Sequence, residues 1–234
     1  MLKFEENTVL EIDSLEGWQQ YTQSGGRLVD SVGFSDRYYN EPDKDGWLIP
    51  GECKVCGSRS EFWVDRLYSG TKTPNWRERV VCVKCGFNCR MRYAVEQVKN
   101  EVRPGARVYC TEFITDLYKE FDRHYIATGS EFLPDVASGT IVDGVRIEDV
   151  TELSFRSNCF DAVLTFDVLE HVPHYDRALT EFHRVLVRDG ILLLTAPFDL
   201  GRDRNLLRAE YVNGKLVPHE PIEMHGDPMN PEGG

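Results

Sequence analysis

The sequence lacks the long hydrophobic runs that a helical membrane protein needs. A membrane-spanning helix takes about 18 consecutive apolar residues, whereas the longest apolar stretches here, such as Ile191–Leu194, have only the length of a strand. The opening residues, Met1–Glu6, turn acidic at once and contain neither the basic segment nor the apolar core of a secretory signal. We therefore expect a cytoplasmic protein without a membrane partner.

Positive charge is scarce, and internal repeats are missing. The 234 residues contain 27 Lys and Arg against 39 Asp and Glu, a formal charge of −12, which argues against a general phosphate-binding surface. The missing repeats exclude a solenoid. A hydrophobic fraction of 41%, with 11% aromatic residues, excludes a globally disordered chain. A folded, acidic protein of one or two domains remains.

Against this acidic background, residues 51–100 form a basic block. They carry ten Lys and Arg against five Asp and Glu, and five of the seven cysteines. Because composition and chemistry change together near residues 50 and 103, we predict three modules. These are an irregular N-terminal arm (1–50), a zinc ribbon with a linking helix (51–102) and an α/β domain (103–234).

The basic block contains two C-x-x-C-G segments, Cys53–Gly57 and Cys82–Gly86. A tetrahedral zinc ion takes four soft ligands, and each segment supplies two thiolates while its glycine permits the turn. We therefore predict a zinc ion bound by Cys53, Cys56, Cys82 and Cys85, the alternative being four reduced, unligated thiols. Cys89 follows closely enough to compete for a ligand position, whereas Cys110 and Cys159 are expected in the core.

The basic side chains of this block can have either of two roles. Its basic side chains, together with Trp76, can contact nucleic acid through phosphates and stacking, or they can pair with the acidic neighbouring modules. These basic side chains are Arg77, Arg79, Lys84, Arg90 and Arg92. The negative charge of the whole chain disfavours nucleic acid as a partner but does not exclude it.

From residue 90 onward, helical and strand patterns alternate. Apolar residues recur at helical spacing in segments 91–102, 113–121 and 175–186, with Gly190 placed to end the last helix. Short apolar segments between them predict strands at 107–110, 124–127, 145–147, 160–166 and 191–198. Such alternation forms βαβ units and predicts an α/β fold with a doubly wound, mainly parallel sheet. After Phe198 we expect only a hairpin, around Asn213-Gly214.

Acidic residues follow three of the predicted strands. Glu131 follows the second strand, Glu148-Asp149-Val150 follows the third, and Asp167 follows the fourth. Ligands of open parallel sheets bind beyond the carboxyl ends of the strands. An acidic residue after the second strand is suited to the hydroxyls of a nucleoside ribose, and one after the third can receive an adenine amino group. Each residue alone is equally typical of a helix cap, but their order favours a nucleoside site.

Three segments carry a resemblance: Phe160–Val172 (FDAVLTFDVLEHV), Glu181–Leu186 (EFHRVL) and Gly190–Phe198 (GILLLTAPF). They resemble the class I S-adenosylmethionine-dependent methyltransferases. The preceding Asn75–Glu78 and Cys82–Arg92 also resemble a bacterial subgroup that carries a zinc ribbon ahead of that domain. The resemblance covers roughly residues 103–200 and implies a Rossmann-like sheet with S-adenosylmethionine as cofactor. It also implies that Glu131 binds the ribose, that Asp149 and Val150 contact the adenine, and that Asp167 lies near the methionine end.

The chain departs from that family in its first loop. Most members have a glycine-rich turn there, because only glycine lets the backbone approach the cofactor closely. The corresponding run, Val108–Phe113, contains no glycine. Either Thr111 and Glu112 bind the amino-acid end of the cofactor in a variant way, or the site has lost affinity. The acidic residues Glu131, Asp149 and Asp167 are still present, which favours retained binding of the cofactor. The closing strands of the family are also missing after Phe198, which suggests a shortened gene product or a fragment.

The implied chemistry is methyl transfer, in which the protein aligns the acceptor and, where needed, removes its proton. His171 is the best candidate for the base by its position, and His225 is a distant second, although the Glu-His-Val context favours a helix-entry residue hydrogen-bonded to the backbone for His171. A small molecule or a saccharide is the expected acceptor, with protein and RNA left open, as is the oligomeric state. Two other hypotheses are a degenerate methyltransferase fold that serves as a scaffold, and a zinc-ribbon nucleic-acid adaptor.

Overall fold

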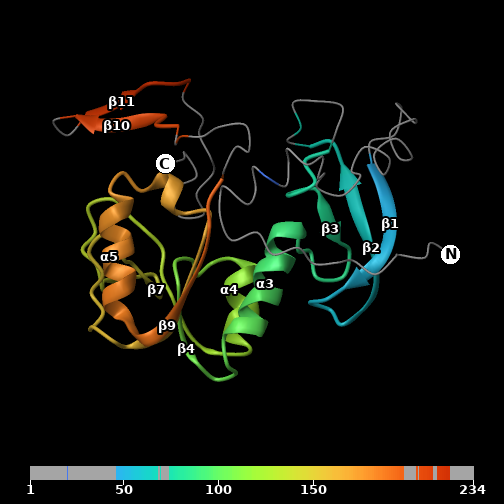
Figure 1. The fold of residues 1–234 in the computed structure, drawn as a ribbon, viewed down its shortest axis with the longest axis horizontal. Helices are drawn as coiled ribbons and strands as arrows, with labels where there is room; N and C mark the ends of the chain where they lie inside the picture. Colours follow the sequence, from blue (N-terminus) through green and yellow to red (C-terminus); the bar gives the residue numbers. More distant parts are fainter. Residues whose placement is uncertain are drawn as a thin grey trace.

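The structure is a computed structural model that describes residues 46–67, 69, 74–197, 204, 206–212 and 215–221, together with Gln20 (Figure 1). Most of the predicted N-terminal arm and the loop around His225 lie outside these residues. The described part comprises a small antiparallel sheet, a parallel sheet flanked by helices, and two short hairpins. None of its helices is long and apolar enough to cross a membrane.

The small sheet is an antiparallel ribbon in the order β1-β2-β3. Its strands are β1 (Gly46–Cys53), β2 (Ser58–Asp65) and β3 (Val80–Cys82). Strand β1 begins at Gly46, so the change in composition near residue 50 falls inside the sheet. Gly57 and Gly86, which follow the two C-x-x-C segments, have φ angles of 61° and 74°, in the left-handed region that glycine adopts without strain. Both C-x-x-C turns therefore form as their sequence favours.

Helix α3 (Cys89–Glu101) connects the ribbon to the parallel sheet. It begins at Asn88, whose side chain accepts a hydrogen bond from the backbone N–H of Met91 at 2.8 Å. Its buried face, Ala94, Val95 and Val98, packs on the parallel sheet in the same apolar cluster as Phe87 from the second cysteine turn. Figure 1 shows the helix standing between the two sheets.

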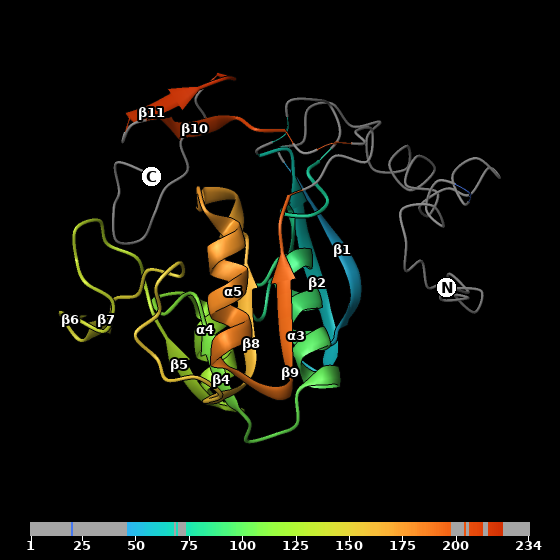
Figure 2. The same ribbon diagram turned by 60° about the vertical axis from the view of Figure 1, so that its left-hand side comes forward.

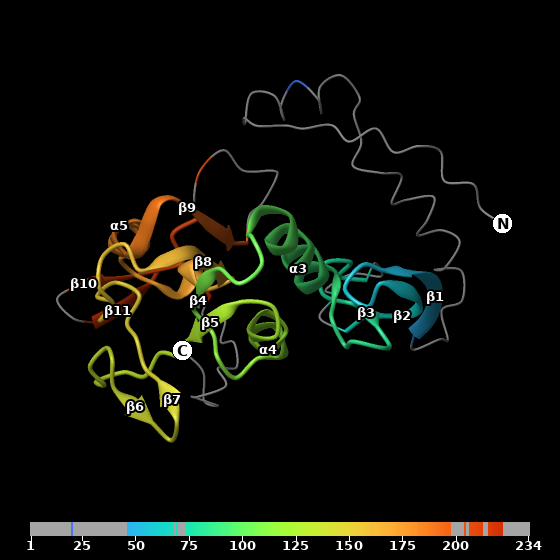
Figure 3. The ribbon, with the colours of Figure 1, turned by 90° about the horizontal axis from the view of Figure 1, so that it is seen from below.

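The parallel sheet has the order β5-β4-β8-β9, and every neighbouring pair of strands is parallel. The strands are β4 (Arg107–Cys110), β5 (Ile126–Gly129), β8 (Phe160–Phe166) and β9 (Leu186–Thr195). Helices α3 and α4 (Asp116–Asp122) lie on one side of these strands and α5 (Tyr175–Val185) on the other (Figure 3). The predicted α/β class, with a parallel sheet that follows a small cysteine-containing module, is confirmed.

Strand β8 is covered on both faces, as its nearly continuous apolar sequence predicts. Ala162, Leu164 and Phe166 belong to the cluster that α3 and α4 complete. Val163 belongs to a second cluster, together with Phe182 of α5. This double coverage fixes the end of β8, and with it the residue that follows, Asp167.

The predicted third strand, 145–147, is wrong as a member of the parallel sheet. Strand β7 (Val145–Arg146) instead pairs antiparallel with β6 (Ile141–Val142) in a separate hairpin. The turn residues Asp143 and Gly144 both have positive φ, 50° and 82°, which is the signature of a two-residue hairpin turn. Ile147 alone keeps the expected place, through one parallel bridge to Glu131.

The ends of two predicted helices also differ from the structure. The predicted helix 113–121 starts at Asp116, because the Thr115 side chain caps it by accepting from the Tyr118 N–H at 3.1 Å. Helix α5 ends at Val185 and passes directly into β9, so Gly190 does not terminate it. Gly190 lies within β9, where a Cβ would come within 2.9 Å of the Val187 carbonyl oxygen, so a close backbone approach explains this glycine.

Beyond the parallel sheet, the hairpin predicted around Asn213-Gly214 is confirmed. Strands β10 (Ala209–Val212) and β11 (Lys215–Pro218) pair antiparallel, with Val212 opposite Lys215. Figure 2 shows this hairpin at the end of the molecule toward which β9 points.

Candidate functional site

Four cysteines meet at one end of the ribbon. Their Sγ atoms all lie within 4.8 Å of one another, with 3.8 Å between Cys53 and Cys85 and 3.9 Å between Cys56 and Cys82. In a tetrahedral site with Zn–S bonds of about 2.3 Å, the sulfur atoms are about 3.8 Å apart. The four predicted metal ligands are therefore brought together at a spacing that suits zinc.

The protein favours the thiolate form of one of these cysteines. Burial acts to raise the pKa of Cys82, but hydrogen bonds from the Ser60 hydroxyl and from the backbone of Cys85 and Lys84 outweigh it and lower the pKa to about 6. Burial raises the pKa of Cys56 and Cys85. A cation that binds all four sulfurs displaces the remaining protons, since the thiolate is the form that ligates metal.

The other three cysteines are not part of this cluster. Cys89, the predicted competitor, accepts a hydrogen bond from Arg92 Nη2 at 3.3 Å instead. Cys110 is buried in the core of the parallel sheet and Cys159 is partly buried against the cluster around α5. Burial raises the pKa of all three thiols.

Most of the basic side chains of the ribbon are paired within the protein. Arg79 donates to both oxygens of Asp65 at 2.7 and 2.5 Å, and Lys84 donates to the carbonyl of Arg59 at 2.6 Å. Arg92 donates to two backbone carbonyls and lies 4.5 Å from the centroid of the Phe62 ring. These side chains stabilise the ribbon, which disfavours their use in contacting nucleic acid.

Two further arginines reach from the ribbon side to the end of β8. Arg77 Nη2 donates to both oxygens of Asp167 at 2.6 and 2.5 Å, and Arg90 Nε lies 3.0 Å from the same carboxylate. Thr195, at the end of β9, adds a third contact through its hydroxyl at 2.9 Å. Asp167 has a φ of 55°, a conformation that Asp adopts more readily than most residues. The carboxylate predicted to border a cofactor thus also joins the ribbon to the sheet.

Glu131 lies buried just beyond β5 and organises the glycine-free first loop. Its Oε1 accepts hydrogen bonds from the backbone N–H groups of Phe113 and Ile114 at 2.7 and 2.8 Å. Among the described residues, none donates to Oε2. The same loop passes close to β5 at Gly129, where a Cβ would come within 2.6 Å of the Glu112 carbonyl oxygen. Only glycine at that position permits this approach.

The other two predicted residues of the first loop point in different directions. Thr111 donates from its hydroxyl to the Thr165 hydroxyl at 3.0 Å and so extends the contact between β4 and β8. The Glu112 carboxylate accepts a hydrogen bond from the Thr115 hydroxyl. Burial raises the pKa of Glu112, and the nearby Glu131 and Asp167 carboxylates act in the same direction. Glu112 is therefore poised to gain a cationic partner, which would relieve this repulsion.

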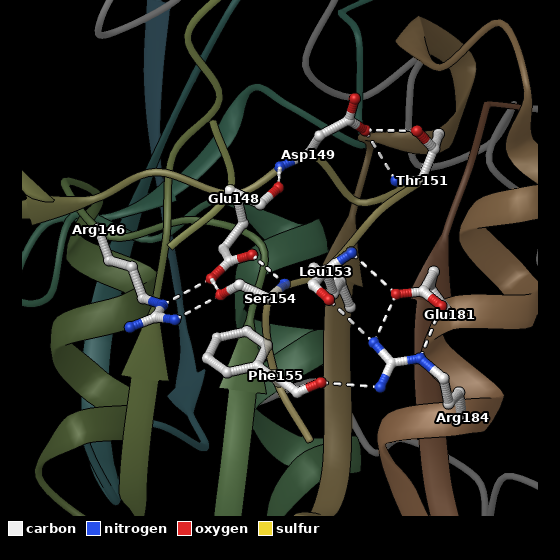
Figure 4. Close-up of polar contacts among 10 residues, drawn as sticks. Arg146, Glu148, Asp149, Thr151, Leu153, Ser154, Phe155, Glu181 and Arg184 are labelled. Atoms are coloured by element: carbon white, nitrogen blue, oxygen red, sulfur yellow. Dashed lines mark hydrogen bonds and ion pairs between the residues drawn. The ribbon is translucent and has the colours of Figure 1, made fainter. Parts of the chain in front are cut away.

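Asp149 belongs to the loop between β7 and β8. Its Oδ1 accepts from the backbone N–H and the hydroxyl of Thr151, at 2.8 and 2.7 Å. Figure 4 shows its other carboxylate oxygen without a marked contact. Val150, beside it, packs against the apolar cluster that includes α5. Glu131 and Asp149 thus share one property: each accepts hydrogen bonds from its loop through only one of its two carboxylate oxygens.

Comparison with known proteins identifies the segment that carries these carboxylates. Residues 94–194 match the family model described as "Methyltransferase domain". We call residues 94–194 the methyltransferase domain, after the family model that they match. The match confirms the resemblance stated from the sequence, and it includes the α3 residues that pack on the parallel sheet.

The individual relatives match only part of this chain and only part of their own length. An uncharacterized protein of Methanocaldococcus jannaschii is 34% identical over 76 residues, which is 32% of each chain. A protein from Bacillus halodurans, provisionally described as a methyltransferase, is 15% identical with a TM-score of 0.36 over 44% of this chain and 45% of its own. The cyclase SpnF is 20% identical with a TM-score of 0.36 over 45% of this chain and 44% of its own. The chain thus spans less than half the length of each of these proteins.

In the methyltransferase domain, the loop that carries Asp149 has almost no regular structure and is held by two ion pairs (Figure 4). Arg146 Nε donates to the fully buried Glu148 at 2.6 Å, and Glu148 also accepts from the Ser154 N–H at 2.8 Å. On the other side, Arg184 donates to the carbonyls of Leu153 and Phe155 at 2.9 and 2.7 Å.

Glu181 completes the second of these pairs. It accepts from Arg184 Nη2 at 2.6 Å and from the Leu153 N–H at 2.8 Å (Figure 4). Sequence reasoning missed the structural role of both pairs, although Glu181 and Arg184 stand at i and i+3 within a predicted helix. That spacing was the one signal available.

His171, the predicted base, lies on the short 3₁₀ helix η1 (Leu169–His171) of the methyltransferase domain. Its side chain is exposed, and its backbone N–H donates to the Val168 carbonyl at 3.0 Å. The turn brings it to the same end of the sheet as Asp167, while its catalytic role stays a prediction.

Proposed function

We propose that this chain is an S-adenosylmethionine-dependent methyltransferase with a structural zinc ribbon, acting on a small-molecule or saccharide acceptor. One observation carries the proposal: within the methyltransferase domain, Glu131 and Asp149 each accept hydrogen bonds from a loop through one oxygen, and no described residue donates to the other oxygen. A ribose needs acceptors for its hydroxyls, and an adenine amino group needs an acceptor of its own. Glu131 Oε2 and Asp149 Oδ2 are suited to these two roles.

The charge of the first loop fits the other end of this cofactor. S-adenosylmethionine carries a sulfonium and an ammonium cation, and Glu112 is a largely buried carboxylate whose pKa is raised by burial and by its acidic neighbours. A cation bound there favours the ionised carboxylate. We propose that Thr111 and Glu112 border the amino-acid end of the cofactor, with Val150 against the adenine. Asp167 would lie near the methionine end while its carboxylate positions Arg77 and Arg90.

When bound, the cofactor supplies an already activated methyl group. The residues of this chain would then chiefly align the acceptor and exclude water from its path. His171 is proposed to receive the acceptor's proton where the acceptor carries one. Cys53, Cys56, Cys82 and Cys85 would hold zinc as a closed structural site, since four protein ligands leave no position for a substrate.

Calorimetric titration with S-adenosylmethionine tests the function. We expect saturable binding to the zinc-loaded chain, weakened about tenfold or more by Glu131→Gln, because the amide cannot accept as strongly from the ribose hydroxyls. Glu101→Gln, at the exposed end of α3, is the matched control and should bind as the wild type does. Absence of heat at millimolar cofactor would instead support the scaffold hypothesis.

A metal analysis tests the ribbon separately. We expect one zinc ion per chain, and Cys56→Ser should reduce this content while Cys159→Ser, outside the cluster, should not. A zinc content near zero in the wild-type chain would overturn the metal assignment without affecting the cofactor proposal.

A further inference from the structure

A cavity of about 480 Å³ opens between α3 and the end of β9, next to Asp167 but outside the residues proposed for the cofactor. It is lined by Arg77, Cys89, Arg90, Tyr93, Leu194, Thr195 and Ala196. These residues come from three parts of the chain: the ribbon side, the linking helix and the last strand of the parallel sheet. Volumes of about 300–1,000 Å³ are typical of sites for small molecules.

The walls of the cavity combine apolar surface with positive charge. Tyr93 and Leu194, which both line the cavity, are 62% and 43% exposed, high values for large apolar side chains. A ligand with an apolar body would cover both. The cationic groups are the guanidinium groups of Arg77 and Arg90, each of which also pairs with Glu78 and Asp167.

Of the residues that line the cavity, Arg90 is the best suited to bind a ligand. Its Nε contacts Glu78 and Asp167, both at 3.0 Å, and its side chain is only 22% exposed. The described residues provide no hydrogen-bond acceptor for its two terminal nitrogens, Nη1 and Nη2. The ion pairs through Nε hold the guanidinium in place, which leaves its terminal edge to bind two oxygens of one anionic group.

We infer that this cavity binds the methyl acceptor, and that the acceptor is a small organic anion whose apolar body lies between Tyr93 and Leu194 while its carboxylate or similar group binds Arg90. The inference rests on the proposed function for the identity of the ligand as acceptor. The cavity lies on the β9 side of Asp167, whereas Glu131 lies on the β5 side, so acceptor and cofactor would approach Asp167 from opposite directions.

Benzoate is a suitable probe, because it combines an apolar ring with one carboxylate. Titrated into the zinc-loaded full chain without cofactor, benzoate should bind at least about tenfold more tightly than its neutral analogue benzamide or the small anion acetate. Arg90→Gln should remove this preference for benzoate over benzamide. Arg188→Gln, an exposed residue at the opposite end of β9, is the control and should preserve it.

A second variant covers the case in which Arg90→Gln impairs folding. Leu194→Asp keeps Arg90 but places a negative charge in the lining of the cavity, and it should abolish benzoate binding while the melting temperature stays near that of the wild type. Benzoate should also slow alkylation of Cys89, mapped by mass spectrometry, without slowing that of Cys159.

The outcomes separate the two proposals. Equal binding of benzoate to the wild type, Arg90→Gln and Leu194→Asp, or no binding of benzoate to the wild type, overturns the cavity assignment even where S-adenosylmethionine binds. Benzoate binding that follows the expected pattern, in a chain that does not bind S-adenosylmethionine, supports an anion site and overturns the methyltransferase proposal instead.

Discussion

The ribbon buries little apolar surface of its own, whereas the parallel sheet is covered on both faces. The buried members of the ribbon cluster are Cys53, Phe62 and Cys82, two of which belong to the four-cysteine group. The methyltransferase domain instead has two large clusters, one on each side of β4 and β8. Small units with too little core need a metal or a crosslink to fold. From this difference we predict that the ribbon depends on the proposed zinc ion and the domain on packing.

The two regions are nevertheless not independent. Phe87, from the second cysteine turn, is buried in the cluster of the parallel sheet, and Cys85 packs against it. The Arg77–Asp167 pair adds a polar connection at the end of β8. Loss of the metal should therefore weaken the edge of the domain that borders α3 while its centre stays folded.

The largest expected effect is that of removing the metal. Chelation, or Cys85→Ser, should unfold the ribbon, because structural zinc contributes about 10–16 kcal/mol in small zinc peptides. Hydrogen exchange should show lost amide protection in β1 and β2 and retained protection in β4 and β8. Cys159→Ser should leave both regions protected. Ribbon amides that stay protected after the zinc is removed would contradict the comparison.

The reverse experiment perturbs the packing of the domain. Phe182→Ala removes a fully buried ring from α5 and should lower the free energy of unfolding of the domain by about 3–5 kcal/mol. The zinc content should stay unchanged. Leu179→Ala on the same helix, where the leucine is 36% exposed, is the matched control and should cost much less. Urea denaturation followed by circular dichroism measures both, and equal losses would argue against the assigned core.

A smaller effect is expected from the connection between the regions. In a double-mutant cycle with Arg77→Ala and Asp167→Ala, the coupling energy should be about 0.5–1 kcal/mol, since Arg77 is 44% exposed and solvent screens the pair. The variants should lower the stability of the α3 edge more than that of α5. A coupling energy of zero would show that the ribbon is joined to the domain through apolar packing alone.

The smallest effect concerns pH, and it should be similar in both regions. Hydrogen bonds from Arg79 lower the pKa of Asp65 in the ribbon to about 2, and those from Arg107 lower the pKa of Asp161 in the domain to about 2. Because both folded-state pKa values lie below the ordinary value, these pairs stabilise the fold at neutral pH. Their contribution is lost as the pH falls below about 4 toward 2.

Denaturation at pH 5 and pH 3 measures this loss. Solvent screens the half-exposed guanidinium of Arg107, so the loss of stability from its pair with Asp161 should be small. Asp161→Asn should reduce the difference in stability between the two pH values. If Asp161→Asn leaves the difference in stability between pH 5 and pH 3 unchanged, other carboxylates cause the acid sensitivity of the domain.

The features that were predictable from the sequence are those that depend on neighbours in the chain. The C-x-x-C-G segments contain their own turn geometry, the apolar run of β8 reports burial on both faces, and Asn213-Gly214 lies between the two strands of the hairpin that forms. The hairpin at Asp143-Gly144 carried the same type of signal, but the expectation of a third parallel strand obscured it.

The features that could not be predicted depend on residues far apart in the chain. Arg77 and Asp167 are separated by 90 positions, and no local pattern relates a ribbon arginine to the end of β8. The use of Glu131 Oε1 by the first loop depends in the same way on how that loop packs against β5. The acidic residues at the strand ends were identifiable as candidates, but their partners were not.

Gly129 shows that the glycine-free first loop depends on a small residue in the neighbouring strand. The loop itself has side chains at every position, and β5 provides the space for its backbone instead. Any side chain at position 129 would therefore push the Glu112 carbonyl away from β5. A substitution in one strand would in that way disturb a loop that lies elsewhere in the sequence.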